Sequence, residues 1–314
     1  MSQTEAEVKL FVRKALPQGR FISRTVVVPY VFLAPFGLLF IVFFILPIFY
    51  ALYQSLFRSQ RSGLGLGAPT ISFYGLGNYH DVLVDKNFFD GLGRILLFGI
   101  VQVPVMLGLA LLLALLLDSA VVRLKPFFRV SFFIPYAVPG VVGALIWGFL
   151  YFPQLSPIVQ LLHSVGVKID FLGAGTVLWS MANIVTWEYT GYNMLIITAA
   201  LQAIPTEQYE SARIDGCTGL GLAWYIKIPQ VAPALVLTCV LSIIGTLQIF
   251  TEPQVLTQIS NSISSNYTPN LYAYFTAFSN NNYYYTAALS VVLAIVSFVF
   301  SFGFLRLTQR YSGV

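Results

Sequence analysis

The chain has 314 residues, of which 57% are hydrophobic and only 9% are charged, and its mean hydropathy is +0.79. Soluble domains carry about 25% charged residues, so this composition excludes a soluble protein and indicates an integral membrane protein in contact with lipid. The formal net charge of +5 does not point to nucleic acid, because the basic residues are distributed according to membrane topology. The two cysteines are too few for a disulfide framework, and their spacing is not that of a zinc or redox site.

Residues 1–25 contain no early apolar run and no small-residue cleavage site, so they are not expected to be a signal peptide. Val8, Val12, Ala15 and Leu16 fall on one helical face, with basic residues elsewhere. This pattern predicts either a short amphipathic helix on the inner leaflet or a solvated basic tail.

Six apolar segments follow, each near the length of about 20 residues that a helix needs to cross the hydrocarbon core. A backbone that faces lipid must satisfy its own hydrogen bonds, so each segment is predicted to be helical. The fold class is therefore an all-α integral membrane protein with six transmembrane helices, and prolines such as Pro135 and Pro139 are expected to kink them. The predicted spans are approximately Val28–Leu52, Ile95–Leu117, Val130–Tyr151, Val177–Ala203, Ala234–Leu256 and Tyr285–Leu305.

Lysine and arginine orient these spans, because cytoplasmic loops are enriched in both. With a cytoplasmic N-terminus, twelve basic residues lie inside and five outside, and the loop 257–283 has none. Both termini are therefore expected in the cytoplasm. The chain is predicted to divide into a segment at 1–27, a six-helix domain at 28–307 with a cytoplasmic loop at 204–233, and a tail at 308–314. The long outer loops could equally dock an external protein or be solvated.

The cytoplasmic loop at 204–233 is the one long polar interruption that does not resemble a simple loop. Thr206 predicts a helix N-cap, acidic residues in the first turns suit the positive end of the helix dipole, and Gly216 predicts a left-handed stop. Glu210 and Arg213 lie three residues apart and can pair on one face. A short, capped, exposed helix between two spans is what a membrane protein would offer to a soluble partner.

Two carboxylates interrupt the spans: Glu188 near the middle of the fourth and Glu252 near the outer end of the fifth. A charge at the bilayer centre costs roughly 3 kcal/mol, so Glu188 is expected to face a polar cavity or a partner. Carboxylate, amide and aromatic groups together suit a polyhydroxylated solute, whereas the alternative is hydrogen bonding between helices. The candidate residues for solute binding are Asn183, Trp187, Glu188, Tyr192, Asn193, Gln248 and Glu252.

The sequence contains no G-x-x-x-x-G-K-[ST] phosphate loop and no soluble segment long enough to hold a nucleotide-binding domain. A nucleophile–base pair and a metal-ligand cluster are not recognisable either. We therefore expect a transport subunit rather than an enzyme, without a cofactor or metal of its own. If the protein works by ATP, the ATP is bound by another chain.

The cytoplasmic loop carries three short motifs in a fixed order: Glu210-Ser211-Ala212, Asp215-Gly216 and Ile226-Lys227-Ile228-Pro229. These motifs, and the nine residues between Gly216 and Ile226, resemble the EAA loop of bacterial ABC-importer permeases. In that loop Glu-Ala-Ala is followed by a Gly and, nine residues later, by Ile-x-Leu-Pro. The pattern departs from the family at Ser211, Cys217, Trp224 and Ile228, and these changes leave the assignment intact.

Other segments resemble the carbohydrate branch of that family, the maltose and glycerol-phosphate type. The resemblance covers roughly residues 28 to 307. The matching segments are Ile204-Pro205 through Pro233 in the loop, Tyr74 to Tyr79, Ile134 to Pro139, and Gly191 to Leu195.

The resemblance implies a coupling helix that sits in a cleft of a cytoplasmic ATPase, which binds ATP and Mg. It also implies a second permease chain, usually a different one, an ATPase dimer, and an external binding protein that delivers a sugar across a bacterial inner membrane. The residues expected to contact the ATPase are Tyr209, Glu210, Ser211, Ala212, Arg213, Asp215 and Gly216.

Two alternatives stay open at this point. An ABC permease for a phosphorylated polyol would be expected to place Arg or Lys in its cavity, and the central spans have no clear candidate. An ion-coupled secondary transporter would also show six spans, but Glu188 alone gives it thin support, and it gives no reason for the loop at 204–233.

Overall fold

The computed structural model describes residues 24–61, 69–119 and 122–312, and the predicted amphipathic helix near the N-terminus lies outside these ranges. The chain divides into two compact units, Met1–Tyr53 and Gln54–Val314.

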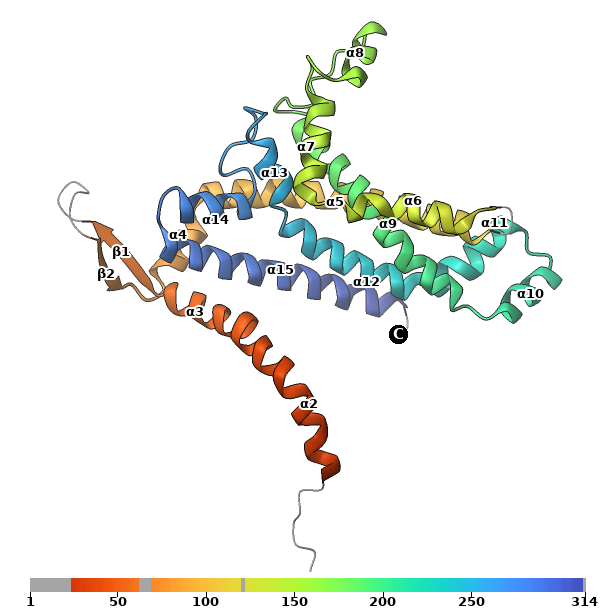
Figure 1. Ribbon diagram of the computed structural model, residues 1–314, viewed down its shortest axis with the longest axis horizontal. Coiled ribbons are helices and arrows are strands. Elements are labelled where there is room, and N and C mark those ends of the chain that lie inside the picture. Colours follow the sequence, from red (N-terminus) through yellow and green to blue (C-terminus); the bar gives the residue numbers. More distant parts are fainter. Residues whose placement is uncertain (1–23, 62–68, 120–121, 313–314) are drawn as a thin grey trace, which may run out of the picture. The chain divides into compact units, whose positions relative to one another are not determined.

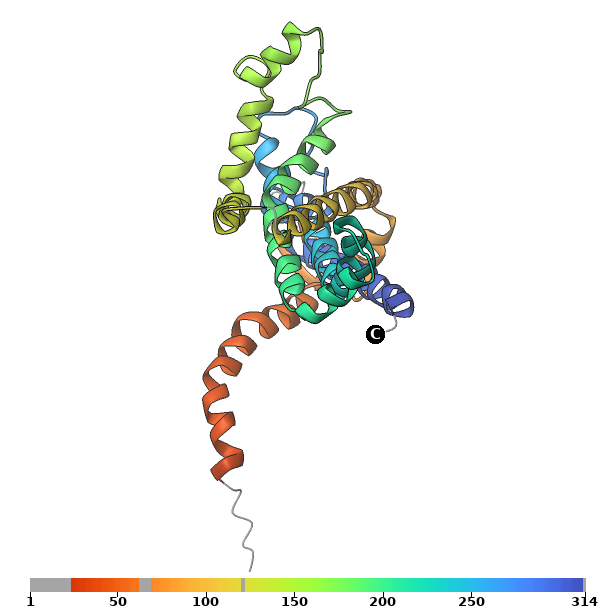
Figure 2. The same ribbon diagram turned by 90° about the vertical axis from the view of Figure 1, so that its right-hand side faces the viewer.

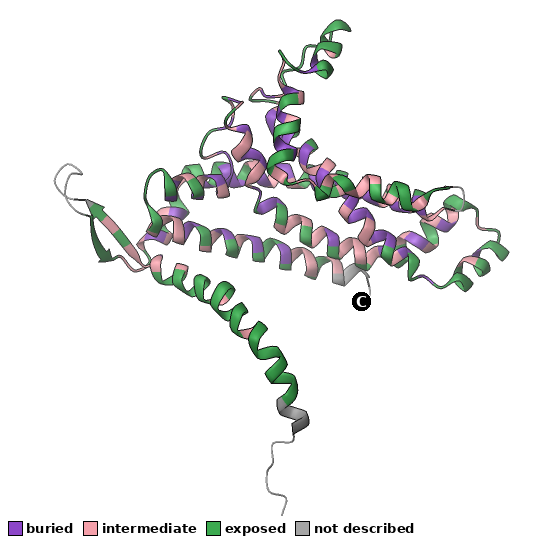
Figure 3. Cartoon of the chain, in the orientation of Figure 1, coloured by how far each residue is buried: buried purple, intermediate pink, exposed green. Residues whose placement is uncertain are grey.

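The first unit contains one long apolar helix made of α2 (Arg24–Phe40), the π-helical turn η1 (Ile41–Ile45) and α3 (Leu46–Gln54). Its sequence is apolar on every face, and none of its most apolar stretch is buried (Figure 3). A helix that is hydrophobic all round belongs in lipid or against other helices. This is the first of the six predicted spans.

The second unit is a helical bundle with α9 (Val177–Gln202) at its centre. This helix packs against α5 (Lys86–Asp118), α6 (Lys125–Ala137) and α12 (Ile228–Leu247), and α12 packs in turn against α15 (Tyr283–Ser312) (Figures 1 and 2). Shorter helices complete the unit: α4 (Gly77–Val84), α7 (Gly140–Tyr151), α8 (Pro157–Ser164), α10 (Thr206–Ile214), α11 (Gly219–Leu222), η2 (Ala223–Lys227), α13 (Thr251–Leu256) and α14 (Pro269–Phe278). The helices α10 and α11 lie at one end of the bundle, and α4 and α14 at the other (Figure 1).

Four helices in the described ranges are long and apolar enough to cross a membrane, and α6 with α7 adds a fifth if that bent pair forms one span. The central helix α9 is not among them, because polar residues interrupt its apolar sequence. With 26 residues it is still about 39 Å long, enough for the hydrocarbon core. All six predicted segments are therefore helical, and the predicted all-α membrane fold is confirmed.

One short hairpin departs from the all-helical expectation, in the segment between α3 and α4. Strand β1 (Phe57–Arg61) pairs antiparallel with β2 (Pro69–Phe73), and the rings of Phe57 and Phe73 meet edge to face at 5.7 Å. The side-chain amide of Asn78 donates to the backbone oxygens of Ser55 and Phe57, at 2.8 and 2.6 Å. These bonds fix the base of the hairpin to the start of α4.

The third predicted span is broken rather than merely kinked. Helices α6 and α7 meet at an angle of 93°, so Val130–Tyr151 is not one continuous helix as predicted. Pro139 occupies the N-cap of α7, and Val138 before it is extended, with φ −75° and ψ 131°. Proline disfavours the helical conformation of the preceding residue, so the break falls where the sequence places it. Pro135 lies inside α6, which continues through it.

Two other spans differ from the prediction at their ends. Helix α5 begins at Lys86, nine residues before the predicted Ile95, because Asp85 caps it by accepting from the backbone N–H of Asn87 at 2.9 Å. The fifth span begins at Ile228 and is interrupted between Leu247 and Thr251, where α12 ends and α13 begins.

The buried residues of the second unit form three clusters, of which the two larger are named here the outer and the inner cluster. The outer cluster joins α5, α9, α13 and α14 through large side chains such as Phe98 and Leu271, and the inner cluster joins α5 and α9 through Ala114 and Ile197. Apolar side chains on the outside of the bundle stay exposed (Figure 3). This pattern suits a bundle whose surface faces lipid.

Candidate functional site

The intramembrane carboxyl groups Glu188 and Glu252 meet inside the second unit. Glu188 projects from the middle of α9 and Glu252 from the first turn of α13, and they are only 6% and 7% exposed. The two carboxyl groups lie close enough to interact electrostatically. In the described part of the chain, Oε2 of Glu188 has no hydrogen-bond partner.

The start of α7 closes over this carboxyl pair. A Cβ atom at Gly140 would lie 3.4 Å from Oε1 of Glu188 and 3.6 Å from Cγ2 of Thr251. The broken third span thus places its second helix directly against the fourth and fifth.

A cavity of about 370 Å³ lies beside Glu252, between α5, α6, α9 and α12. Four of the seven predicted solute-binding residues line it: Tyr192, Asn193, Gln248 and Glu252. The ring of Tyr192 stacks on that of Tyr136 at 4.6 Å with 20° between the planes, which gives the wall a flat aromatic surface. Glu188 lies next to this wall through its contact with Glu252.

The remaining two predicted solute-binding residues, Asn183 and Trp187, lie outside this cavity. The amide of Asn183 donates to the hydroxyl of Tyr151 at 2.8 Å, and that hydroxyl donates to the backbone oxygen of Ser180 at 3.1 Å. The ring of Trp187 packs edge-on against Trp147 at 5.9 Å. Asn183 lines a separate, mostly aromatic and aliphatic pocket of about 390 Å³ near α8, and Trp187 lines neither pocket.

The cavity also contains a polar residue that the sequence did not single out. Gln102 on α5 is buried, and its amide nitrogen donates to Oγ1 of Thr186 at 3.4 Å and to the sulfur of Met106 at 3.4 Å. Its amide oxygen lacks a hydrogen-bond partner within the described residues. Its position as a lone amide inside an apolar span was the available signal, since such groups are expensive in lipid.

The loop at 204–233 contains the predicted short helix, α10. The helix begins at Thr206 with Pro205 in the N-cap position, so the prediction of Thr206 as N-cap was wrong by one residue. The predicted stop at Gly216 is confirmed: its φ is +85°, its N–H donates to the oxygen of Arg213 at 3.1 Å, and the next N–H donates to the oxygen of Ala212 at 2.9 Å. This is the hydrogen-bond pattern of a Schellman cap, which glycine favours.

The predicted ATPase-contact residues divide by exposure. Tyr209 is half-buried and Ala212 is buried, and they lie three residues apart on the face toward the bundle. The exposed members of the set are Glu210, Ser211, Arg213, Asp215 and Gly216. The predicted pair of Glu210 with Arg213 is not formed in the described part of the chain.

Comparison with known proteins supplies a family for this arrangement. Residues 106–313 match the family described as binding-protein-dependent transport system inner membrane component. The chain is 32% identical over 274 residues to the sn-glycerol-3-phosphate transport system permease protein UgpA of Agrobacterium fabrum, which covers 86% of this chain and 90% of the relative. It is 32% identical over 291 residues to the arabinooligosaccharides transport system permease protein AraP of Bacillus subtilis, which covers 91% and 90%.

The fold is also that of a solved structure. A chain of a bacterial ABC transporter that imports the acidic polysaccharide alginate superimposes with a TM-score of 0.77 at 17% identity, covering 90% of this chain and 95% of that one. That transporter is also known in complex with an alginate pentasaccharide-bound periplasmic protein.

Proposed function

Because the chain belongs to the family of inner membrane components of binding-protein-dependent transport systems, we propose that its cavity passes a neutral sugar or oligosaccharide. The proposal rests on the chemical groups that line this cavity. Amide and carboxyl groups from Gln102, Gln248 and Glu252 can accept and donate hydrogen bonds with hydroxyl groups, and the stacked tyrosines offer a flat surface to sugar C–H groups.

Charge decides between a neutral and a phosphorylated substrate. Lysine and arginine are absent from the residues that line the cavity, and Glu252 adds a carboxyl group to its wall. A phosphate group is normally held by Arg or Lys, so this wall disfavours it. The relative that transports sn-glycerol-3-phosphate keeps a phosphorylated polyol as the second candidate.

The rest of the machinery follows from the same proposal. A second permease chain would complete the pore, a cytoplasmic ATPase dimer would bind ATP and Mg, and an external binding protein would deliver the sugar. The exposed face of α10 would contact the ATPase, which places α10 and both chain termini in the cytoplasm. Alternating access would then be driven by the different affinity of the ATPase for ATP in the two states.

Purification from native membranes in mild detergent, followed by intact-mass analysis, tests the assembly. We expect two ATPase copies and a second permease of similar size to accompany this chain. A homo-oligomer without an ATPase, found in more than one detergent, would contradict the proposal and favour an ion-coupled secondary transporter.

Uptake into proteoliposomes tests the substrate. The purified assembly and its binding protein should accumulate a labelled neutral sugar when ATP is supplied on the ATPase side. If sn-glycerol-3-phosphate is accumulated and neutral sugars are not, the second candidate is correct.

A further inference from the structure

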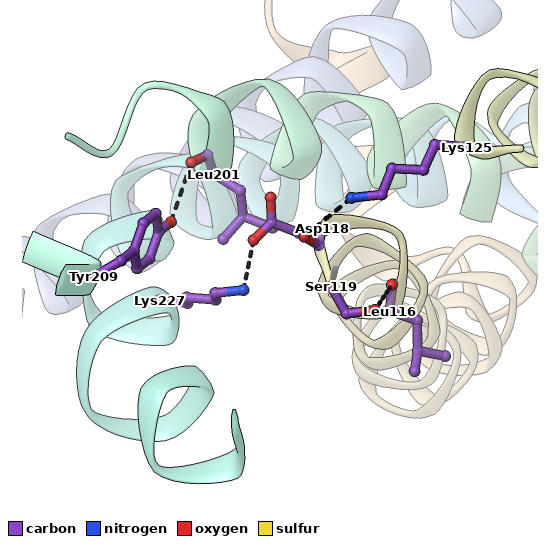
Figure 4. Close-up of polar contacts among 7 residues, drawn as sticks. All are labelled: Leu116, Asp118, Ser119, Lys125, Leu201, Tyr209 and Lys227. Atoms are coloured by element: carbon purple, nitrogen blue, oxygen red, sulfur yellow. Dashed lines mark hydrogen bonds and ion pairs between the residues drawn. The ribbon is translucent and has the colours of Figure 1, made fainter. Parts of the chain in front are cut away.

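One partly buried ion pair joins the end of the bundle that carries α10. Nζ of Lys227, the last residue of η2, lies 2.5 Å from Oδ2 of Asp118, the last residue of α5 (Figure 4). The two side chains are 11% and 21% exposed. The other ion pair in the described ranges, between His80 and Asp81, lies on the surface at the far end of the bundle.

Further contacts converge on the same two residues. Nζ of Lys125, at the start of α6, donates to the backbone oxygen of Asp118 at 3.3 Å, where the α5 dipole is negative. The ammonium of Lys227 lies 5.5 Å from the ring centre of Tyr209, whose hydroxyl donates to the oxygen of Leu201 at 3.4 Å (Figure 4). Helices α5, α6, α9 and α10 and the turn η2 therefore meet around one ion pair.

Tyr209 is the main side chain by which α10 contacts the residues around the ion pair of Lys227 with Asp118. It is half-buried among residues of the inner cluster, and Ala212 is the other inward residue of α10. Burial, followed by the negative charge of Asp118, raises the pKa of Tyr209 above its ordinary value, which keeps its hydroxyl a hydrogen-bond donor. A separate contact, from the amide of Gln230 to that of Gln208 at 2.6 Å, lies on the exposed surface.

We propose that Asp118, Lys227 and Tyr209 form the joint that carries movement of α10 into α5 and α12. This inference rests on the proposed function, in which α10 receives the movement of the ATPase. A partly buried ammonium–carboxylate pair adds a short charge-assisted hydrogen bond that fixes the distance between Lys227 and Asp118. Lys227 is thus a positioning residue that contacts neither the ATPase face nor the sugar cavity.

The test uses the whole transporter in proteoliposomes with its binding protein. Lys227→Met keeps the length of the side chain and removes its charge. We expect normal co-purification of the ATPase, but a stimulation of ATP hydrolysis by sugar-loaded binding protein that falls roughly 2- to 30-fold, the range for residues that carry coupling between sites. Sugar transported per ATP should fall with it.

Two further variants keep the test decisive if the single variant folds poorly. The double variant Asp118→Leu with Lys227→Met leaves no buried charge unpaired, so it should fold but remain weakly stimulated. The charge exchange Asp118→Lys with Lys227→Asp should recover stimulation. Gln230→Ala, which removes the exposed contact to α10, is the matched control and should behave as the native protein.

Full stimulation in the folded double variant would overturn the inference and leave the proposed function standing. Equal loss in the charge exchange and in the double variant would also overturn it. Failure of the proposed function has a different signature, namely an ATPase that never co-purifies with the native chain.

Discussion

Gly191 is a single residue on which the contact between α6 and α9 depends. A Cβ atom at this position would overlap the carbonyl group of Phe132 and would lie 3.0 Å from the Cα atom of Phe133. These are backbone atoms of α6, which cannot rotate away as a side chain could. The absence of a side chain therefore lets α6 lie against the central helix and bring Tyr136 to the cavity.

Gly191→Ala should force the two helices apart. We expect a loss of about 1–3 kcal/mol in the free energy of unfolding, the usual cost of overpacking, measured as a lower thermal unfolding temperature in detergent. Gly108→Ala is the matched control, since a Cβ there meets nothing within 4 Å. An unfolding temperature for Gly191→Ala equal to that of the control would show that α6 does not lie as close as described.

Asp85 gives the end of the bundle that carries α4 and α14 a dependence on pH. Its Oδ2 accepts from the hydroxyls of Tyr272 and Tyr285 at 2.6 and 2.5 Å. Burial raises the pKa of this carboxyl, but these two hydrogen bonds and those from the backbone N–H groups of Asn87 and Phe88 outweigh it, so its pKa lies below the ordinary 3.8. The carboxylate is therefore favoured in the folded state.

Because the folded pKa of Asp85 is depressed, its contribution to stability is present above pH 3.8 and is lost as the pH falls through the folded value. Thermal unfolding between pH 3 and pH 7 should show this acid-side loss in the native chain. Asp85→Asn should be less stable at pH 7 and should lack that part of the pH dependence. Parallel pH curves for the two proteins would mean that Asp85 does not stabilise the fold through its charge.

The break between α6 and α7 is the element with the clearest cause in the sequence. Pro139 removes a backbone donor and holds Val138 extended, so Pro139→Ala should let the helix continue and open the 93° angle. Spin labels at the exposed positions of Phe127 and Phe149, in a chain whose native cysteines are replaced by alanine, should move apart. Pro135→Ala is the control, because α6 already continues through that residue.

The opposite result would be a distance between the two spin labels that is the same in Pro139→Ala as in the native sequence. The angle would then be set by the packing of α7 against Glu188 and Thr251, with the proline only marking its place. Uptake measured on the same variant shows whether the angle matters for transport. We expect it to fall, since the start of α7 covers the carboxyl pair.

The sequence predicted the helices well, because hydropathy and proline report directly on the part of a helix that lies in lipid. The segment Val177–Ala203 was predicted to within one residue of α9. The start of α5 was missed, since its first nine residues are polar enough to leave the hydrocarbon, and only the cap at Asp85 marks them. The place of the α6–α7 break follows from Pro139, but the value of its angle, 93°, is not contained in the sequence pattern.

Only part of the site was predicted, and the reason is geometric. Asn183 and Asn193 belong to the same helix, but ten residues of helix span about 15 Å, so they cannot both line one small cavity. Which residues of α9 line the cavity depends on which part of that helix the neighbouring helices leave uncovered. The sequence marks Gln102 as a polar group inside an apolar span, but only the packing of α5 on α9 places it at the cavity wall.

Within the second unit, the proposed sugar cavity and the helix α10 lie far apart along the bundle. The proposed sugar cavity adjoins Glu252, in the first turn of α13, and α10 lies at one end of the bundle (Figure 1). Between them run α9 and α12, which line the cavity and lead to the two ends of the loop at 204–233. Rigid helices with contacts at both ends can link the two sites without any residue that belongs to both.

This separation predicts that variants at the two places change different quantities. Glu210→Lys, on the exposed face of α10, should reduce the ATPase that co-purifies while the residual uptake keeps its KM for sugar. Gln248→Ala, in the cavity wall, should retain the ATPase and raise that KM roughly 2- to 10-fold, as expected for one lost hydrogen bond. Each variant is the control for the other, since both leave the fold of the bundle unaltered.

The opposite results would contradict the assignment of Gln248 to sugar binding and that of α10 to ATPase contact independently of each other. If Gln248→Ala loses the ATPase, then residue 248 supports the bundle and does not contact the sugar. If Glu210→Lys changes only the KM, then α10 is not the ATPase contact, and the ion pair of Lys227 with Asp118 stabilises the cytoplasmic end of the bundle without transmitting movement. Co-purification and KM measured on the same preparations therefore decide whether one end of the bundle drives the other.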